Sequence, residues 1–224
     1  MRINIPQVGF ETKIVEGKVT VISIESPEHY ASVLNDIWNQ SNGIPGEVIW
    51  SENEKQLRFD SEISCIFNVL DLDLNNRKVI TKLYKELSQN GNDQLPEETA
   101  RMKEVIFDYL DRLLQTVPYG IDYDFELELS AVLKCFNVKL TPVDEDLLSK
   151  TIDYLRAQND ICRINNFILI QGKSFFSNTQ LQQLYEFVRY HKLNLIILEN
   201  IHTNIAEYEK NWIIDFDNCI IEVN

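Results

Sequence analysis

The most concentrated side chains that could do chemistry form an acidic run, which comprises Asp122, Asp124, Glu126 and Glu128. If a helix begins near Phe125, these carboxylates form two pairs at four-residue spacing on shared helix faces. Carboxylate oxygens suit calcium and magnesium, and a hard cation would offset the repulsion within each pair. The alternative is a solvated helix start whose acids interact favourably with the helix dipole. The run is therefore a candidate metal site with a plain structural alternative.

A second candidate, Gly172-Lys173-Ser174, follows an apolar strand-like segment and invites comparison with a phosphate-binding loop. Such a loop needs a first glycine five positions before the second, so that the backbone can wrap around the phosphates. That position is Phe167, which lies inside the apolar segment itself. The other strand that could lead into such a loop, at residues 18–24, is followed by two acids and by no glycine or lysine. We therefore expect a head built like a nucleotide triphosphatase but without a working nucleotide site.

A third segment begins like a calcium loop, with Asp71, Asp73 and Asn75 at its first, third and fifth positions. The glycine expected at the sixth position is Asn76, and the glutamate expected at the twelfth is Lys82. The segment is therefore no EF-hand, and we interpret Asn75 as the N-cap of a helix that follows a strand.

The remaining reactive side chains predict no catalysis. His29, His191 and His202 lie far apart without the spacing of metal ligands. No serine, cysteine or threonine lies in the pattern of a nucleophile elbow. We therefore expect a protein that is not an enzyme.

The basic residues are few and unevenly distributed. Lys82 and Lys85 belong to a cluster in the first long helical segment, and Lys134 and Lys139 bracket the end of a later one. On a single copy these are ordinary surface lysines. In a symmetric oligomer that repeats them around one opening, their contacts with phosphates would add.

The hydrophobic pattern predicts strands and helices around these residues. Strands are expected at residues 18–24, 65–70, 167–171, 193–199 and 219–223, with a short hairpin from residues 47–50 and 56–59. Helices are expected from Pro27, around residues 79–87, from Pro96, at residues 125–137, 146–157 and 179–191, with a loop at residues 90–93. The apolar stripe of the helix from Pro96 comprises Met102, Val105, Ile106, Tyr109 and Leu113.

The order of these elements predicts the fold class. Strand, helix and strand follow each other near the end of the chain, which is typical of a βαβ crossover with parallel strands. We expect an α/β fold with a degenerate P-loop-NTPase-like head, which contains a mixed sheet and is interrupted by a long α-helical leg. The head is expected at residues 1–74 and 158–224, and the leg at residues 75–157.

Composition excludes several classes of function. The 224 residues include 21 Lys and Arg against 35 Asp and Glu, a formal net charge of −14. This balance argues against a general nucleic-acid coat but is compatible with a local basic surface. Four cysteines without a CxxC pair argue against zinc and predict buried free thiols. We expect neither a membrane span nor a signal peptide, and hence a cytoplasmic protein.

Several segments, taken in order, resemble the type II-A CRISPR adaptation proteins of the Csn-two family. The opening Asn4-Ile5-Pro6 is similar to the family's first strands, and residues 69–75 resemble its strand-to-helix junction. Further similar segments are residues 17–22, 82–87, 133–140, 167–170, 183–187, 195–199 and 214–215. No single motif is diagnostic, but the ordered set spans essentially the whole chain.

This resemblance implies a calcium-dependent homotetrameric ring that takes part in spacer acquisition, a step of antiviral defence. The ring would hold double-stranded DNA in its central opening without sequence specificity, and would prefer linear DNA or DNA ends. Lys134 and Lys139, with Lys82 and Lys85, would contact the DNA, and Asp122, Asp124, Glu126 and Glu128 would hold calcium. The implied partners are other type II-A adaptation proteins and the effector nuclease.

A second reading treats the same ring as a non-catalytic scaffold that docks other adaptation proteins, with DNA contact secondary. Its acidic surface would suit basic nucleases as partners. A residual nucleotide switch is a third reading, and the missing glycines argue against it.

Overall fold

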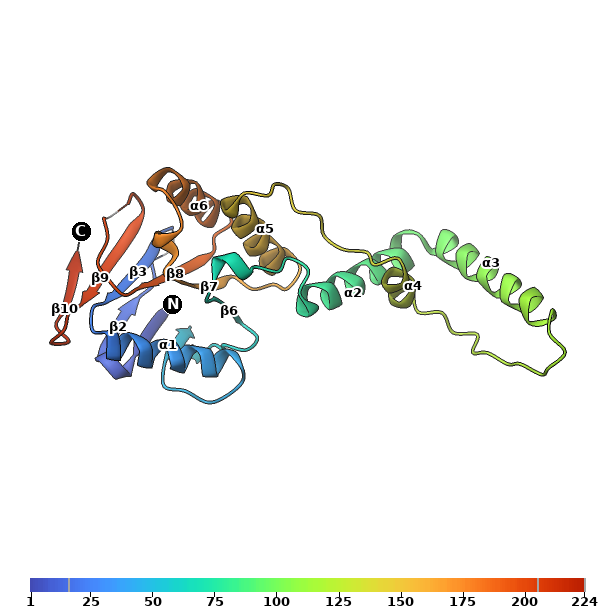
Figure 1. Ribbon diagram of the computed structural model, residues 1–224, viewed down its shortest axis with the longest axis horizontal. Coiled ribbons are helices and arrows are strands. Elements are labelled where there is room, and N and C mark those ends of the chain that lie inside the picture. Colours follow the sequence, from blue (N-terminus) through green and yellow to red (C-terminus); the bar gives the residue numbers. More distant parts are fainter. Residues whose placement is uncertain (16, 205, 224) are drawn as a thin grey trace. The chain divides into compact units, whose positions relative to one another are not determined.

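The computed structural model describes residues 1–15, 17–204 and 206–223, and it divides the chain into two compact units (Figure 1). Unit 1 comprises Met1–Leu74 and Pro142–Asn224, and unit 2 comprises Asn75–Thr141. The sequence placed the end of the helical segment at residue 157, whereas the structure places it at residue 141. The reason is α5 (Leu147–Asp160), which belongs to unit 1 because its side chains Leu148 and Leu155 are buried there.

Unit 1 is built around a six-stranded sheet with the order β10-β9-β3-β8-β7-β6. Adjacent strands from β9 to β6 are parallel, and β10 is antiparallel to β9. The strands are β3 (Val19–Ile24), β6 (Ile63–Ile66), β7 (Asn166–Ile170), β8 (Asn194–Glu199), β9 (Glu209–Ile214) and β10 (Ile220–Val223). The predicted mixed α/β class is confirmed, and its kinship with P-loop triphosphatases stays a prediction.

A second, four-stranded antiparallel sheet has the order β2-β1-β4-β5. Its strands are β1 (Arg2–Ile5), β2 (Phe10–Lys13), β4 (Ile49–Glu52) and β5 (Lys55–Gln56). The predicted hairpin is present but shifted toward its turn, where Asn53 and Glu54 both have positive φ angles of 47° and 67°. Two consecutive left-handed residues match the twist that a tight hairpin requires.

One core joins α1 (Pro27–Ser41) to facing sides of the two sheets. Val33 and Ile37 of α1 are fully buried, as are Trp50 of β4 and Ile196 of β8. The helices α5 and α6 (Asn178–Tyr190) cover the opposite face of the six-stranded sheet, where Leu184 is fully buried (Figure 1). Both faces of the parallel strands are therefore covered, as parallel sheets require.

Unit 2 consists of α2 (Arg77–Gln94), α3 (Pro96–Leu114) and α4 (Leu129–Cys135). The predicted loop at residues 90–93 is wrong, because α2 continues through it. Leu129 packs against buried Gly91, whose carbonyl accepts a hydrogen bond of 2.9 Å from Thr99 Oγ1. These contacts outweigh the weak helix propensity of Asn and Gly in the segment.

Two smaller expectations also differ from the structure. Asn76, rather than Asn75, is the N-cap of α2, since its side chain accepts from the amides of Lys78 and Val79. Cys135 and Cys219 are exposed, so the expectation of buried thiols is wrong for these two. Across the described ranges, no helix combines the length and apolar character that crossing a membrane would take.

We predict that Gly46→Ala destabilises unit 1. A Cβ atom at this position would collide with the Asp36 carboxylate and lie 2.6 Å from Gln40 Cγ. The Asp36 carboxylate is held in place because it accepts hydrogen bonds from the amides of Glu47 and Val48. The expected loss is about 1–3 kcal/mol in the free energy of unfolding, measured with urea.

The matched control for this substitution is Gly120→Ala. Nothing lies within 4 Å of a Cβ atom built at Gly120, so the expected change is within about 0.5 kcal/mol. Equal losses for the two variants would contradict the steric explanation.

Candidate nucleic-acid interface

The main feature of unit 2 is a groove of about 620 Å³ between α2 and α4. Lys85 of α2 and Lys134 of α4 both line it, although 49 positions separate them in sequence. Glu128 is the one acid in this lining, and the other polar residues are uncharged. The structure thus brings together two of the four lysines that the sequence singled out.

The packing of α2 against α4 is reinforced by hydrogen bonds to the segment after α4. The Tyr84 hydroxyl donates to the carbonyl of Val138 at 2.9 Å. The Asn75 side chain donates to the carbonyl of Leu140 at 3.1 Å and accepts from its amide at 2.8 Å. Lys139, between these two anchored residues, is exposed while both neighbours are partly buried. Its backbone is therefore fixed on unit 2 and its side chain reaches solvent.

Lys82 is exposed on α2 and lies on the same helix face as Lys78 and Lys85. It does not line the groove. The groove also contains Tyr84 and a polar stripe of Thr81, Ser88 and Asn92, which the sequence analysis missed. The four- and three-residue spacing of these side chains along α2 was the signal that could have found them.

The four candidate calcium ligands are not gathered in this structure. Asp122, Asp124, Glu126 and Glu128 are all exposed and lie before α4, which begins at Leu129 rather than near Phe125. The four-residue spacing therefore does not place them on one helix face. Within the described ranges, no three or more His, Cys, Asp or Glu side chains are arranged to hold a metal ion. Their oxygen donors fit calcium chemically, whereas their positions do not form a site.

An aromatic cluster attaches the acidic segment to α3. The Tyr123 hydroxyl donates to Asp111 Oδ1 at 2.7 Å, and the ring stacks on Phe107 at 6.1 Å between centroids. The hydrogen bond to Asp111, with the nearby charges of Asp108 and Asp122, raises the pKa of Tyr123 to about 12. Phe125 packs on the same rings. Asp108 and Asp111, three residues apart on α3, were not among the candidate residues predicted from the sequence.

The Gly-Lys-Ser segment of unit 1 is folded around a buried ion pair. Lys173 Nζ lies 2.9 Å from a carboxylate oxygen of Glu209, and the two side chains are 4% and 0% exposed. The same amine donates to the carbonyl of Asn204 at 2.6 Å. Gly172 lies against Leu169 and Ile197 on the sheet, so its missing side chain serves packing. The positive charge of Lys173 is therefore buried and offset by Glu209, so it is not available to bind a phosphate.

Two further groups complete this buried cluster. The Tyr185 hydroxyl donates to Glu209 at 2.7 Å, and burial beside that carboxylate raises the pKa of Tyr185 above its usual range. Glu199, at the end of β8, accepts the Lys173 amide at 2.9 Å. Burial raises the pKa of Glu199, and its second oxygen has no hydrogen-bond partner among the residues that the structure describes. A phosphate placed here would meet two carboxylates.

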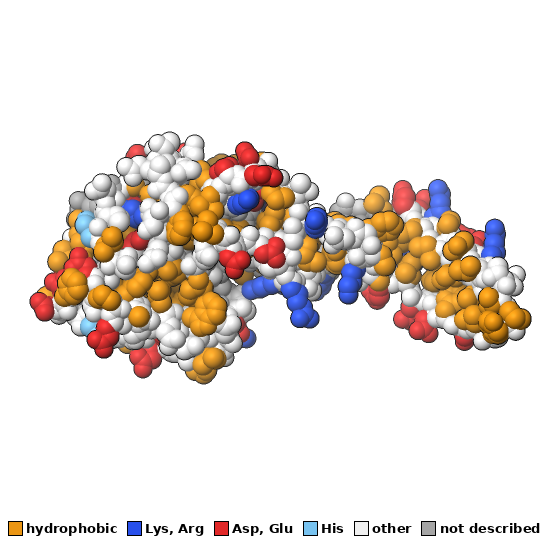
Figure 2. Space-filling view, in the orientation of Figure 1, with side chains coloured by type: hydrophobic (Ala, Val, Ile, Leu, Met, Phe, Trp, Pro, Cys, Tyr) orange, Lys and Arg blue, Asp and Glu red, His pale blue; other side chains and the backbone are white. Residues whose placement is uncertain are grey.

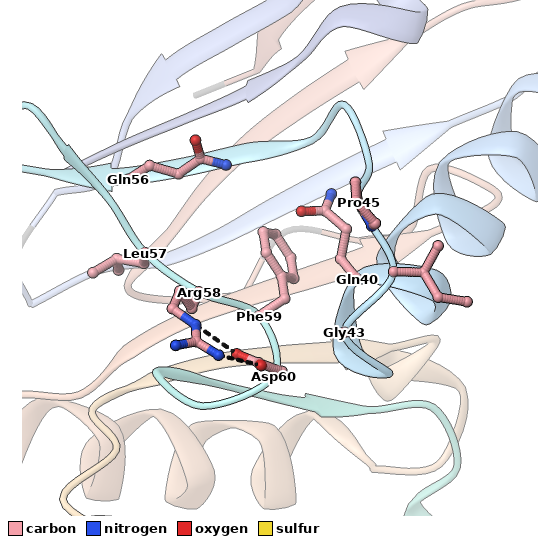
Figure 3. A pocket seen from close by; sticks show the side chains of 9 residues that line it. Gln40, Gly43, Pro45, Gln56, Leu57, Arg58, Phe59 and Asp60 are labelled. Atoms are coloured by element: carbon pink, nitrogen blue, oxygen red, sulfur yellow. Dashed lines mark hydrogen bonds and ion pairs between the residues drawn. The ribbon is translucent and has the colours of Figure 1, made fainter.

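A smaller pocket of about 340 Å³ lies in unit 1 between the end of α1 and residues 56–60 (Figure 3). Its two charged lining residues, Arg58 and Asp60, pair with one another through two hydrogen bonds of 3.1 and 2.6 Å. Gln40 donates to the carbonyl of Val48. The side chains of Gln40, Arg58 and Asp60 are therefore already paired within unit 1.

Comparison with known proteins gives a matching family model and several similar solved structures. The family model described as CRISPR-associated protein (Cas_Csn2) matches residues 40–218. Stu0660 of Streptococcus thermophilus has 11% sequence identity and a TM-score of 0.59, covering 100% of this chain and 76% of its own. The ADP conformation of MJ1267, an ATP-binding cassette of an ABC transporter, has 12% identity and a TM-score of 0.49, covering 95% and 82%. No curated protein matches the sequence significantly.

We predict that Lys173→Met strongly destabilises unit 1. The substitution leaves the Glu209 carboxylate buried without its cation, which costs about 3–5 kcal/mol in the free energy of unfolding. The double variant Lys173→Met with Glu209→Gln should lose much less, because no unpaired charge remains. Urea denaturation measures both. A stable Lys173→Met protein, or a rise in the melting temperature of the wild type with ATP, would contradict this account.

Proposed function

Because this chain belongs to the CRISPR-associated Csn2 family, we propose that it serves CRISPR adaptation as a calcium-dependent homotetrameric ring that binds double-stranded DNA. The DNA would be held by its phosphates in the central opening, without reading of the base sequence. Linear DNA or DNA ends would be preferred, because a closed circle cannot thread a closed ring. Other adaptation proteins and the effector nuclease would be its protein partners.

The observation that carries the DNA proposal is the groove that Lys85 and Lys134 share. Two helices contribute one cation each, and one acid, Glu128, opposes them. Lys82 and Lys139 add two exposed cations to the same unit. Because four copies multiply a net charge of −14, DNA would bind only where such cations are concentrated.

Support for self-association comes from α3. This helix has no buried residue, and its apolar stripe exposes 62% of Val105, 63% of Tyr109 and 44% of Leu113. Figure 2 shows apolar side chains gathered over the end of α3 and the loop that follows. The sequence predicted this stripe, and within the described residues of one chain Met102 and Ile106 are only partly buried while the other three stay exposed. A second copy of the chain would bury it, as contiguous exposed apolar surfaces of this kind mark interaction sites.

Calcium is part of the proposal on chemical grounds. The acidic segment at residues 122–128 supplies oxygen donors, and a bound cation would neutralise carboxylates that repel one another. The segment would have to close, since its acids are dispersed in this structure. The lysines of unit 2 would contact DNA without any step at calcium.

We further propose that the protein is not a catalyst. His29, His191 and His202 lie at the ends of different elements. The buried cluster around Lys173 holds this amine between carboxylates and supports the fold instead.

We predict that the double variant Lys85→Ala with Lys134→Ala weakens binding of a linear duplex. Loss of two phosphate contacts should reduce the magnitude of the slope of log K against log salt by about 2 for each contacting copy. Fluorescence anisotropy over a salt series measures this slope. Arg101→Ala with Lys103→Ala on α3 is the matched control in the same unit, with equal charge removed. An equal effect of the control pair would contradict the assignment.

DNA topology distinguishes the ring from the scaffold reading. A ring should retain linear duplex after a high-salt wash only while its ends are blocked, and it should not load onto a closed circle. Binding of the circle as tight as that of the linear duplex would contradict threading.

We predict that calcium binding depends on the acidic segment. A variant with Asp122→Asn, Asp124→Asn, Glu126→Gln and Glu128→Gln should lose calcium binding in titration calorimetry. It should also show the molecular mass, by light scattering, that the wild type shows after chelation. The control is Glu97→Gln with Glu98→Gln at the start of α3. Unchanged calcium affinity of the segment variant would place the ligands elsewhere.

A further inference from the structure

A row of cations lies along the edge of the six-stranded sheet where its parallel strands begin. Lys18 immediately precedes β3, Lys192 precedes β8 by two residues and Arg163 precedes β7 by three. The sheet order places these three strands side by side. The Asn194 amide donates to the Asn165 carbonyl at 2.8 Å, which holds the last two loops together. All three cations are exposed.

A fourth cation, Arg189, extends the row by packing on the ring of Tyr208. Tyr208 precedes β9, and its carbonyl accepts the Val19 amide at 2.9 Å, which places it beside the start of β3. The Arg189 guanidinium lies 3.9 Å from the centroid of the Tyr208 ring. Adjacent strands are about 4.8 Å apart, so the four strands from β9 to β7 span about 14 Å. The three cations that precede β3, β8 and β7, together with Arg189 on the Tyr208 ring, are thus distributed along this distance.

The backbone does not require cations at two of these positions. Arg163 and Lys192 follow the ends of α5 and α6 with φ angles of 61° and 52°. Glycine or asparagine adopts this left-handed conformation more easily. A cation there complements the helix dipole, but so would one within the last turn. Arg163 and Lys192 therefore adopt a backbone conformation that is less favourable for them than for glycine or asparagine, and the fold alone does not explain why cations occupy these positions.

Among the residues that the structure describes, these charges form no ion pairs. Lys18, Arg163, Arg189 and Lys192 take part in none of the ion pairs found over residues 1–15, 17–204 and 206–223. Asp160, Glu186 and Glu207 lie within three residues of Arg163, Arg189 and Tyr208, and none of these three acids pairs with the row. Glu16, the acid nearest to Lys18 in sequence, lies outside the described residues.

A planar ring stands free beside the row. Tyr190 is 85% exposed at the end of α6, immediately after Arg189. It contacts His191 edge-on at 5.1 Å, and His191 in turn packs on Phe187 at 4.3 Å. The inner rings are supported by one another and by Arg156 over Phe187, so Tyr190 has a rigid base and an open face. Open aromatic faces beside cations are typical of surfaces that stack unpaired bases.

We propose that this strand-edge patch, comprising Lys18, Arg163, Arg189, Tyr190 and Lys192, binds a single-stranded segment of nucleic acid. The cations would contact successive phosphates, and Tyr190 would stack on an unpaired base. A duplex would leave the ring without a partner, because its bases are already stacked in pairs. The patch lies within unit 1 and uses none of the lysines assigned to duplex binding, so it goes beyond the proposed function and does not depend on it.

The test uses the full chain and two fluorescent probes, an oligo-dT of about 15 nucleotides and a blunt duplex. Arg163→Asn with Lys192→Asn removes two charges, and asparagine suits the left-handed backbone, so the fold should be retained. This pair should lower the affinity for oligo-dT roughly tenfold at low salt and reduce the salt slope by about 1.4. Tyr190→Ala should lower the affinity roughly tenfold with the salt slope unchanged.

The matched control is Lys13→Asn with Lys150→Asn, two exposed lysines elsewhere in unit 1, which should leave oligo-dT binding unchanged. The duplex probe should respond to Lys85→Ala with Lys134→Ala and not to the strand-edge variants, so the two proposals can fail separately. Unchanged oligo-dT binding in both strand-edge variants would overturn the proposal. So would competition by poly-glutamate as strong as that by unlabelled oligo-dT, since this outcome assigns the patch to acidic proteins.

Discussion

Strand β3 is buried at every residue from Val19 to Ile24, and the rest of unit 1 follows from that constraint. A strand buried on both faces must be flanked by strands and covered by two layers. Its neighbours are β8 and β9, which are both parallel to it. One face is covered by α1 and the four-stranded sheet, and the other by α5 and α6. Ligand chemistry is thereby confined to the two edges where strands begin and end.

At the edge where β7 and β8 end, the chain fills the available space with its own charges. Glu199 accepts the amide of Lys173, whose amine reaches across the sheet to Glu209. Buried ion pairs of this type seldom add much stability relative to an apolar core, but losing one partner is costly. The position that would serve a phosphate is thus a structural cluster, which agrees with the absence of a glycine-rich loop in the sequence. At the opposite edge, where strands begin, the cations are exposed and form no ion pairs with the residues that the structure describes.

Local pattern predicted the elements well where packing agreed with it. The run of β-branched residues predicted β3, and Pro27 predicted the start of α1, where the Ser26 side chain accepts an N-cap hydrogen bond from the His29 amide. Pattern failed where a distant contact decided the outcome. Leu129 packs against Gly91 and keeps α2 helical through residues that favour a loop. Lys85 and Lys134 share a groove because α2 pairs with α4, and no spacing rule links residues so far apart. The stripe of α3 was visible in the sequence, and its residues Val105, Tyr109 and Leu113 stay exposed in the structure.

The chain's acidity also determines how its cationic surfaces can act. At physiological ionic strength charges are screened beyond about 8 Å, so the net charge of −14 repels an approaching polyanion mainly at short range, wherever acids are densest. The groove in unit 2 and the strand edge in unit 1 each bring exposed cations from separate elements close together. Neither surface can steer DNA from a distance, because the surrounding charge is of the wrong sign. Binding at either surface must therefore rest on close contacts with phosphates, and for the strand edge on Tyr190 as well. Such short-range contacts favour nucleic acid that assembly or threading has already brought close to the protein. They favour it over nucleic acid that would have to be attracted from a distance.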